Sequence, residues 1–313
     1  MKKQKEQKTE QSGNGKGTTI YINPRTDFGF KRLFMEGLKA KVRLLDLLKT
    51  FFPEPLGGAS HLVVKPTELL GDIENEKRVV LDILAFVDEK TRSLIEMQRA
   101  QKPLFVERSI FYTCRLVSKG LKRGDDYDIP TVLTLCITDK TLPEFADLDG
   151  FFHTAQLRRM DGKNISEKLI LGYLDLSKFA APNPGQIKDM QFADRQEKWG
   201  YTLANVGRME LQDLSQEDEV FRSVFEDSMH QKLTKMEKEE YKKSVLEYED
   251  VQEAVRYAHE QGLEQGLEQG LEQGRAVEKR ELARNMLAES LDPAIVAKIS
   301  GLTEEELQNL TRE

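Results

Sequence analysis

Apolar residues recur at helical spacing in the first stretch of the chain with a regular pattern, which begins near Ile20. Thr26 and Asp27 are both suitable N-cap residues, and the apolar positions that follow are Phe30, Leu33, Phe34, Leu38, Leu45 and Leu48. The pattern predicts one helix that ends before Pro53, because proline in a helix interior breaks the helix.

The apolar segments that follow change to the patterns of strands. Two runs, VVLDILAFVD (residues 79–88) and SLIEMQ (residues 93–98), flank a polar EKTR segment and predict a β-hairpin. The run TVLTLCIT (residues 131–138) is apolar almost throughout, as is typical of a buried central strand. Further strands are expected at residues 61–64 and 169–176, and a helix at residues 103–122. This succession predicts an α/β core with a mixed sheet.

The chain becomes helical and acidic after Trp199. From Glu260 it contains a tetrapeptide repeat, EQGL EQGL EQGL EQGR, whose period exceeds one helical turn by about 40° per repeat. Each glycine weakens such a helix by roughly 1 kcal/mol. We interpret residues 259–275 as a helical linker; the alternative is a weak self-association seam.

Residues 276–313 predict a small helical module. Asp292 and Pro293 have the pattern of a helix start, and Thr303 with Glu306 forms a capping box before the last helix. The module is interpreted as a dimerisation tail, a partner-binding unit or a helix-turn-helix-like unit.

Composition narrows the class of protein. Residues 1–19 are polar and predict a disordered tail, which leaves residues 20–258 as the main domain. No apolar run reaches 18 residues and the N-terminus has no apolar core, so neither a membrane span nor a secretory signal is expected. Two cysteines, Cys114 and Cys136, exclude a disulfide framework and favour the cytoplasm. No phosphate-binding loop and no dinucleotide fingerprint occurs, so no nucleotide cofactor is expected.

The net charge of −7 does not exclude a nucleic-acid partner. Fifteen acidic and seven basic residues lie between Glu210 and Glu260. The net charge of this segment is therefore more negative than that of the whole chain, and the remaining residues together are close to neutral. Basic residues elsewhere can therefore form a patch.

Candidate chemistry lies in the predicted hairpin, where Asp82 and Glu96 interrupt apolar strands and Gln98 shares a strand face with Glu96. If the register brings the two carboxylates together, Mg²⁺ would relieve their repulsion, and Gln98 could orient a water or a phosphate oxygen. A one-residue slip would send Asp82 to the other face. The alternative is that both carboxylates lie on a solvated face of the sheet.

Three segments in order, TDFGFKRLF (26–34), VVLDILAFVDEKTRSLIEMQ (79–98) and FVERSIFYTCRLVSKGLKRGDDY (105–127), resemble the PD-(D/E)XK nuclease family transposases, also called the recombination-promoting nuclease family. DRQEKWGYTLAN (194–205) and the EQG repeat are also typical of that family. The resemblance implies a restriction-endonuclease-like α/β/α core, a helical C-terminal region, and metal-dependent DNA cleavage that promotes recombination.

The resemblance also implies residue roles. Asp82 and Glu96 match the two acidic motif positions and, with the carbonyl of Met97, are expected to hold Mg²⁺, or Mn²⁺ as a substitute. Gln98 stands where the motif usually has lysine. The other implied positions are Asp27, from which a further acidic residue approaches the metal, and Arg108 and Tyr112 at the family's Arg and Tyr positions. Lys31 lies four residues after Asp27 on the same helix face, from which it could take over phosphate contact.

Lys119, Lys122 and Arg123 end the predicted helix, where they either track the DNA backbone or only stabilise the helix dipole. Arg108 is expected to contact either a phosphate or a core carboxylate. The expected protein is a DNA endonuclease, most simply a homodimer, that lies in the cytoplasm. The alternatives are a DNA-binding protein on the same fold with weak or no catalysis, and an interaction scaffold.

Overall fold

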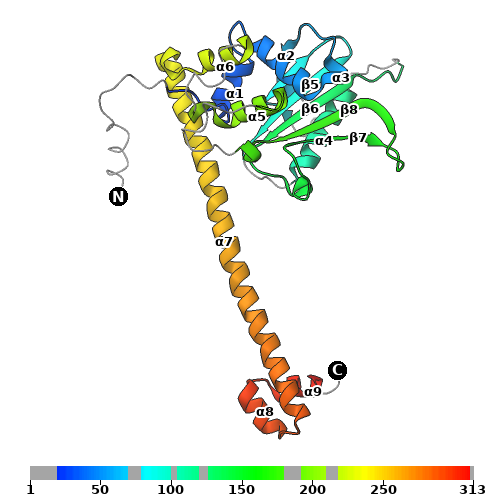
Figure 1. The fold of residues 1–313 in the computed structure, drawn as a ribbon, viewed down its shortest axis with the longest axis vertical. Coiled ribbons are helices and arrows are strands. Elements are labelled where there is room, and N and C mark those ends of the chain that lie inside the picture. Colours follow the sequence, from blue (N-terminus) through cyan, green and yellow to red (C-terminus); the bar gives the residue numbers. More distant parts are fainter. Residues whose placement is uncertain are drawn as a thin grey trace. The chain divides into compact units, whose positions relative to one another are not determined.

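The computed structural model describes residues 20–69, 79–99, 104–119, 126–179, 192–208 and 218–310 (Figure 1). The tail expected over residues 1–19 lies outside them. The chain divides into two compact units, Met1–Gln252 and Glu253–Glu313, and each is described by itself.

The first unit is built on a six-stranded sheet with the order β1-β4-β5-β6-β8-β7. Neighbouring strands are antiparallel except for the β5–β6 and β6–β8 pairs, which are parallel. The predicted mixed sheet is thus confirmed. The strands are β1 (Val63–Lys65), β4 (Ile83–Phe86), β5 (Thr91–Gln98), β6 (Thr131–Thr138), β7 (Phe152–Arg158) and β8 (Asn164–Asp175), and a separate pair is formed by β2 (Glu68–Leu69) and β3 (Val79–Val80).

Helices cover both faces of this sheet, as expected for an α/β/α core. The larger core lies under α1 (Asp27–Phe34), α2 (Ala40–Phe51), α3 (Pro53–Leu56), α5 (Arg195–Asn205) and α6 (Glu219–Ser228). The opposite face packs against α4 (Phe105–Ser118). Short 3-10 turns lie at Pro143–Phe145, Leu176–Phe179, Val206–Arg208 and His230–Lys232.

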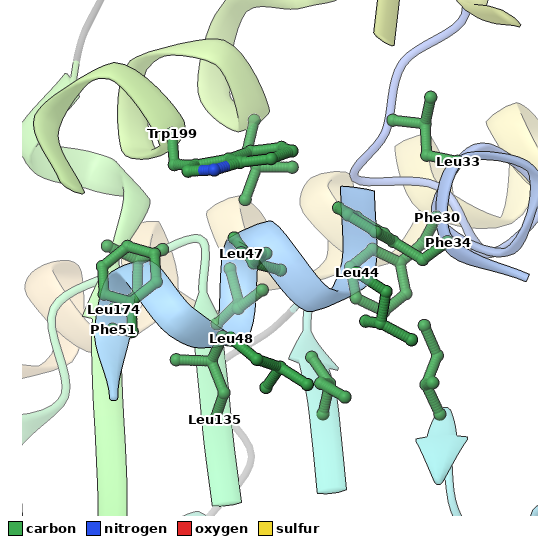
Figure 2. Packing of buried hydrophobic residues seen from close by; sticks show 14 of the residues in the cluster. Phe30, Leu33, Phe34, Leu44, Leu47, Leu48, Phe51, Leu135, Leu174 and Trp199 are labelled. Carbon is green, nitrogen blue, oxygen red and sulfur yellow. The ribbon is translucent and has the colours of Figure 1, made fainter. Parts of the chain in front are cut away.

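Helix α2 is the centre of the larger core. Leu48 and Phe51 point toward Leu135 and Leu174 on the strands, and Trp199 of α5 lies on the other side of the helix (Figure 2). All five side chains are 2% exposed or less. Burial of such side chains contributes about 1.5–3 kcal/mol each, which makes α2 the main connection between α5 and the sheet.

The prediction of a single helix before Pro53 is wrong, because α1 and α2 are separate helices. Thr26 is the N-cap of α1, and its Oγ1 accepts the N–H of Gly29 at 3.0 Å. Gly37 then has φ of +82°, in the left-handed region where glycine is favoured and a helix ends. Leu38, expected on the apolar face, is fully exposed as a result.

The central strand was predicted at its observed bounds, and β7 was not predicted. Residues Thr131–Thr138 form β6, which is buried along almost all its length between two parallel neighbours. Strand β7 lies at the edge of the sheet, and its residues are exposed or half-buried. Its sequence therefore lacks the alternation of apolar and polar residues that marks a strand with one buried face.

The EQGL repeat lies inside one continuous helix, α7 (Lys235–Ala288), which begins in the first unit. The repeat leucines Leu263, Leu267 and Leu271 are all more than half exposed. In the second unit, α8 (Pro293–Ser300) and α9 (Glu304–Leu310) follow α7, with a small core made of Ala283, Val296 and Leu307.

Both predicted helix starts of this unit are confirmed. Asp292 caps α8 by accepting the N–H of Ala294 at 2.8 Å. Thr303 and Glu306 form the reciprocal bonds of a capping box at α9, at 2.8 and 3.3 Å. Among the described residues, no helix combines the length and the apolar character that a membrane span needs.

Candidate active site

Asp82 and Glu96 face each other across the β4–β5 hairpin. The register pairs Ile83 with Ile95 and Leu84 with Leu94, which brings Asp82, just before β4, opposite Glu96. The main-chain N–H of Asp82 donates to Glu96 Oε1 at 3.2 Å. The question of register that the sequence left open is thereby answered in favour of the paired carboxylates.

The pair does not lie on a solvated face. Glu96 is 7% exposed and Gln98 is 5% exposed, on the face of the sheet that α4 covers. Asp82 is half-buried, and its Oδ2 accepts the main-chain N–H of Met97 at 2.7 Å. The solvated-face alternative is therefore wrong, and both carboxylates carry the cost of burial.

Burial changes the acidity of both groups, and the charge of Asp82 adds to the change at Glu96. Burial raises the pKa of Asp82, and the hydrogen bond from Met97 only partly opposes this. Burial together with the negative charge of Asp82 raises the pKa of Glu96 to about 8, against the opposing charge of Arg108. Two facing carboxylates whose charged forms are disfavoured in this way form a site that a cation would stabilise.

Helix α4 places Arg108 and Tyr112 beside this pair, one turn apart on the same side of the helix. Arg108 donates through Nη2 to Gln98 Oε1, and its guanidinium lies over the ring of Phe105 at 5.0 Å. Burial, with the charge of Glu96, raises the pKa of Tyr112. Arg108 thus bonds the carboxamide of Gln98 and brings a positive charge close to Glu96.

Helix α1 contributes Asp27 and Lys31 on another side of the site. Lys31 Nζ lies 2.8 Å from Asp27 Oδ2, and Arg99 Nη2 lies 3.3 Å from Asp27 Oδ1. All three charges act on the pKa of Asp82, with Arg99 and Lys31 lowering it and Asp27 raising it. Asp27 is therefore paired with two cations.

Arg99 is a residue of this site that the sequence reasoning missed. It directly follows β5, and its Nε also donates to the main-chain carbonyl of Arg25 at 3.0 Å. The available signal was its place immediately after Glu96 and Gln98, at the end of a strand that carries candidate chemistry.

A sequence model of the PD-(D/E)XK nuclease family transposases matches residues 24–258. The chain belongs to this family. A second model, described as the C-terminal helix-turn-helix domain of the Rpn/YhgA-like nuclease family, matches residues 277–312. No curated protein and no solved structure matches the chain.

The resemblance found in the sequence is thus confirmed, and the matched range covers about three quarters of this chain. The matched range includes the hairpin across which Asp82 and Glu96 face each other, and the matched helix-turn-helix region covers the end of α7 together with α8 and α9. Of the proposed helix-turn-helix, dimerisation and partner-binding interpretations of residues 276–313, the match supports the first.

The donor set of this candidate site fits a hard divalent cation. Asp82 and Glu96 offer carboxylate oxygens from facing strands, which Mg²⁺ and Mn²⁺ prefer, and their raised pKa values indicate uncompensated charge. Within the part of the chain that is described, no cluster of three or more Asp, Glu, His or Cys could hold a metal. Asp27 accordingly does not form a three-carboxylate cluster with Asp82 and Glu96, and its part in metal binding stays a prediction.

The remaining residues are those predicted at the end of the α4 helix, together with Trp199 of α5. Lys119 follows the last turn of α4 and is exposed, whereas Lys122 and Arg123 lie outside the described residues. Trp199 is a core residue, since it is fully buried and its Nε1 donates to Asp46 Oδ2 at 2.7 Å.

Proposed function

We propose that the protein is a metal-dependent DNA endonuclease that promotes recombination, in the manner of a mobile-element nuclease. The observation that carries the proposal is the pairing of the half-buried Asp82 with the buried Glu96, held across the hairpin beside Arg108. The family match supports a nuclease role of this kind.

The residues of the hairpin would hold the metal ion and orient its ligands. Asp82, Glu96 and the main-chain carbonyl of Met97 would hold Mg²⁺, with Mn²⁺ as a possible substitute. A cation bound there polarises the phosphodiester and lowers the pKa of the attacking water. The hydrogen bond from Met97 fixes the direction of the Asp82 carboxylate, and the N–H of Asp82 fixes that of Glu96.

Positive charge for the phosphate comes from outside the motif strand. Arg108 is held in place by Gln98 and by the ring of Phe105, so its guanidinium is ordered before substrate arrives. Lys31 lies on the Asp27 side, where it neutralises that carboxylate and contacts the incoming strand. Gln98 in this account is a positioning residue for Arg108, and Arg108 supplies the charge that lysine provides elsewhere.

The C-terminal helix-turn-helix region supports DNA as the substrate, because this fold commonly binds duplex DNA. A homodimer would place two such sites on the two strands of a duplex. Tyr112 and Lys119 on α4 are proposed to contact the DNA near the site.

The test is the cleavage of supercoiled plasmid in Mg²⁺ by the wild type, Asp82→Asn and Glu96→Gln. The matched control is Glu167→Gln, which removes an exposed carboxylate from the part of β8 remote from the carboxyl ends of the parallel strands. Nicking by the wild type and the control, lost in both site variants and in EDTA, is expected. An inactive wild type, or equal cutting by the site variants, would contradict the proposal.

A DNA-binding protein without efficient catalysis is the second candidate. It is favoured by glutamine at the motif's lysine position and by the pairing of Asp27 with Lys31 and Arg99. In that case a DNA fragment binds with a steep salt dependence that EDTA does not alter, and no metal ion produces a cut.

A further inference from the structure

The first turns of α7 present a row of polar side chains to the edge of the candidate active site. Tyr241, Ser244, Tyr248 and Gln252 follow one another at intervals of three or four residues, so they lie on one side of the helix. Each makes a hydrogen bond to a residue far away in the sequence. We call these four residues the α7 strip.

The first half of the strip holds the segment that leads into α1. Tyr241 Oη accepts the main-chain N–H of Asn23 at 2.9 Å, and Ser244 Oγ accepts that of Phe28 at 3.0 Å. Both donors flank Asp27, so these contacts fix the approach of α1 to Asp82.

The second half of the strip reaches the carboxyl ends of β5 and β6. Gln252 Nε2 donates to the main-chain carbonyl of Arg99 at 2.6 Å, and Tyr248 Oη donates to Asp139 Oδ2 at 2.8 Å. The ring of Tyr248 also lies 5.5 Å below the guanidinium of Arg25. The helix therefore contacts the two residues that directly follow the central strands.

Asp139 connects these contacts to the motif strand. It is 7% exposed, and its main-chain N–H donates to the carbonyl of Gln98 at 3.1 Å. Its carboxylate accepts from Tyr248 and lies 3.8 Å from Arg25 Nη1. A carboxylate buried this deeply is costly unless its partners stay in place, so the loss of one partner would loosen the end of β5.

We propose that Asp139, Tyr248 and Gln252 position the candidate active site, and that α7 is a structural part of the nuclease rather than only a connection to the helix-turn-helix region. Through Gln252 the helix fixes Arg99, whose charge acts on Asp82. Through Tyr248 and Asp139 it fixes the main chain at Gln98, next to Arg108. The family match ends at residue 258, so it includes the strip and excludes the repeat.

This inference rests on the proposed endonuclease function for its effect on cleavage, and its structural part can be tested without activity. The variants are Tyr248→Phe, which keeps the ring over Arg25 and removes the hydroxyl, and Gln252→Leu, which removes the amide. The matched control is Tyr257→Phe, an exposed tyrosine further along α7. All are made in the full chain, and thermal unfolding verifies that each variant folds.

The first measurement is amide hydrogen exchange at residues 96–99 and at Asp139. Faster exchange there, by about fivefold or more, is expected in Tyr248→Phe and Gln252→Leu and not in Tyr257→Phe, because one lost hydrogen bond weakens local closure by about that factor. Unchanged exchange in both strip variants would overturn the positioning role, whatever the activity.

The second measurement is steady-state cleavage in Mg²⁺. We expect kcat to fall by about tenfold in each strip variant while the KM for DNA changes by less than about twofold, since a shifted site loses transition-state contacts and not binding. Raised exchange with an unchanged kcat would overturn the link to cleavage. A wild type that does not cut would refute the endonuclease function, and the exchange result would still decide the positioning role.

Discussion

Asp82 and Glu96 each depend on a main-chain N–H of the facing strand. The N–H of Asp82 donates to Glu96 Oε1, and the N–H of Met97, which follows Glu96, donates to Asp82 Oδ2. This reciprocal arrangement holds two mutually repelling carboxylates at fixed positions before any ligand arrives. The site is thus preorganised at the expense of fold stability, as expected where function sets the geometry.

The stability of the metal-free protein should fall as the pH rises from about 4.5 to about 8. The pKa of Glu96 is raised to about 8 from its ordinary value of 4.5, so in this window the folded chain keeps a proton that the unfolded chain releases. Below the window both states are protonated and the penalty is absent. At pH values above the window the penalty on folding reaches its full size, which is up to about 5 kcal/mol.

Urea unfolding in EDTA at several pH values measures this effect. Glu96→Gln carries no charge, so its unfolding free energy should decline less over the same window, and Glu167→Gln should follow the wild type. Parallel curves for the wild type and Glu96→Gln would show that Glu96 has an ordinary pKa.

Mg²⁺ should stabilise the wild type against heat and leave the double variant Asp82→Asn/Glu96→Gln unaffected. A ligand that binds only the folded state adds about 2.7 kcal/mol at a hundredfold excess over its Kd. Differential scanning fluorimetry with Mg²⁺, Mn²⁺ and Na⁺ at matched ionic strength separates site binding from screening. An equal shift of the wild type and the double variant would argue against a metal at this pair.

Arg108→Met should reduce kcat by about 10²–10³, because it removes the preorganised charge next to Glu96 and leaves Gln98 without this partner. Arg108→Lys keeps the charge but not the planar donors, so an intermediate loss is expected. Lys119→Met, on the same helix, should instead weaken DNA binding and reduce its salt slope by about one. A kcat for Arg108→Met equal to that of the wild type would remove Arg108 from the mechanism.

Local patterns predicted the elements where one physical effect dominates. A nearly all-apolar run predicted β6 because both of its faces are buried, and the capping residues of α8 and α9 predicted their starts. The division between α1 and α2 escaped prediction because it depends on one left-handed glycine, Gly37, inside a continuous apolar pattern. Strand β7 escaped because an exposed edge strand needs no apolar alternation.

The site was predictable as a set of residue types and not as a set of contacts. Asp82 and Glu96 were noticeable because carboxylates are rare inside apolar strands, but only the hairpin register shows that they meet. The partners of Asp139 on α7 lie more than a hundred residues away, and no short-range pattern connects Tyr248 with the end of β6. Such contacts depend on the path of the whole chain.

Two identical substitutions at helix glycines should have opposite effects. A Cβ at Gly29 would lie 2.1 Å from the main-chain oxygen of Asn23, which also accepts from Thr26, so Gly29→Ala must displace the start of α1. At Gly266 nothing lies within 4 Å, so alanine there only removes the cost of glycine in a helix. We expect Gly29→Ala to destabilise the first unit by about 2–4 kcal/mol, from overpacking and a weakened cap, and to reduce cleavage by moving Asp27 and Lys31.

Urea unfolding followed by Trp199 fluorescence reports on the first unit, and helical circular dichroism reports on the repeat. Gly266→Ala should leave the fluorescence midpoint unchanged and raise helicity, with a gain of about 1 kcal/mol in local helix stability. If Gly29→Ala unfolds at the wild-type midpoint, the close approach of Asn23 to α1 is not a constraint and does not set the positions of Asp27 and Lys31.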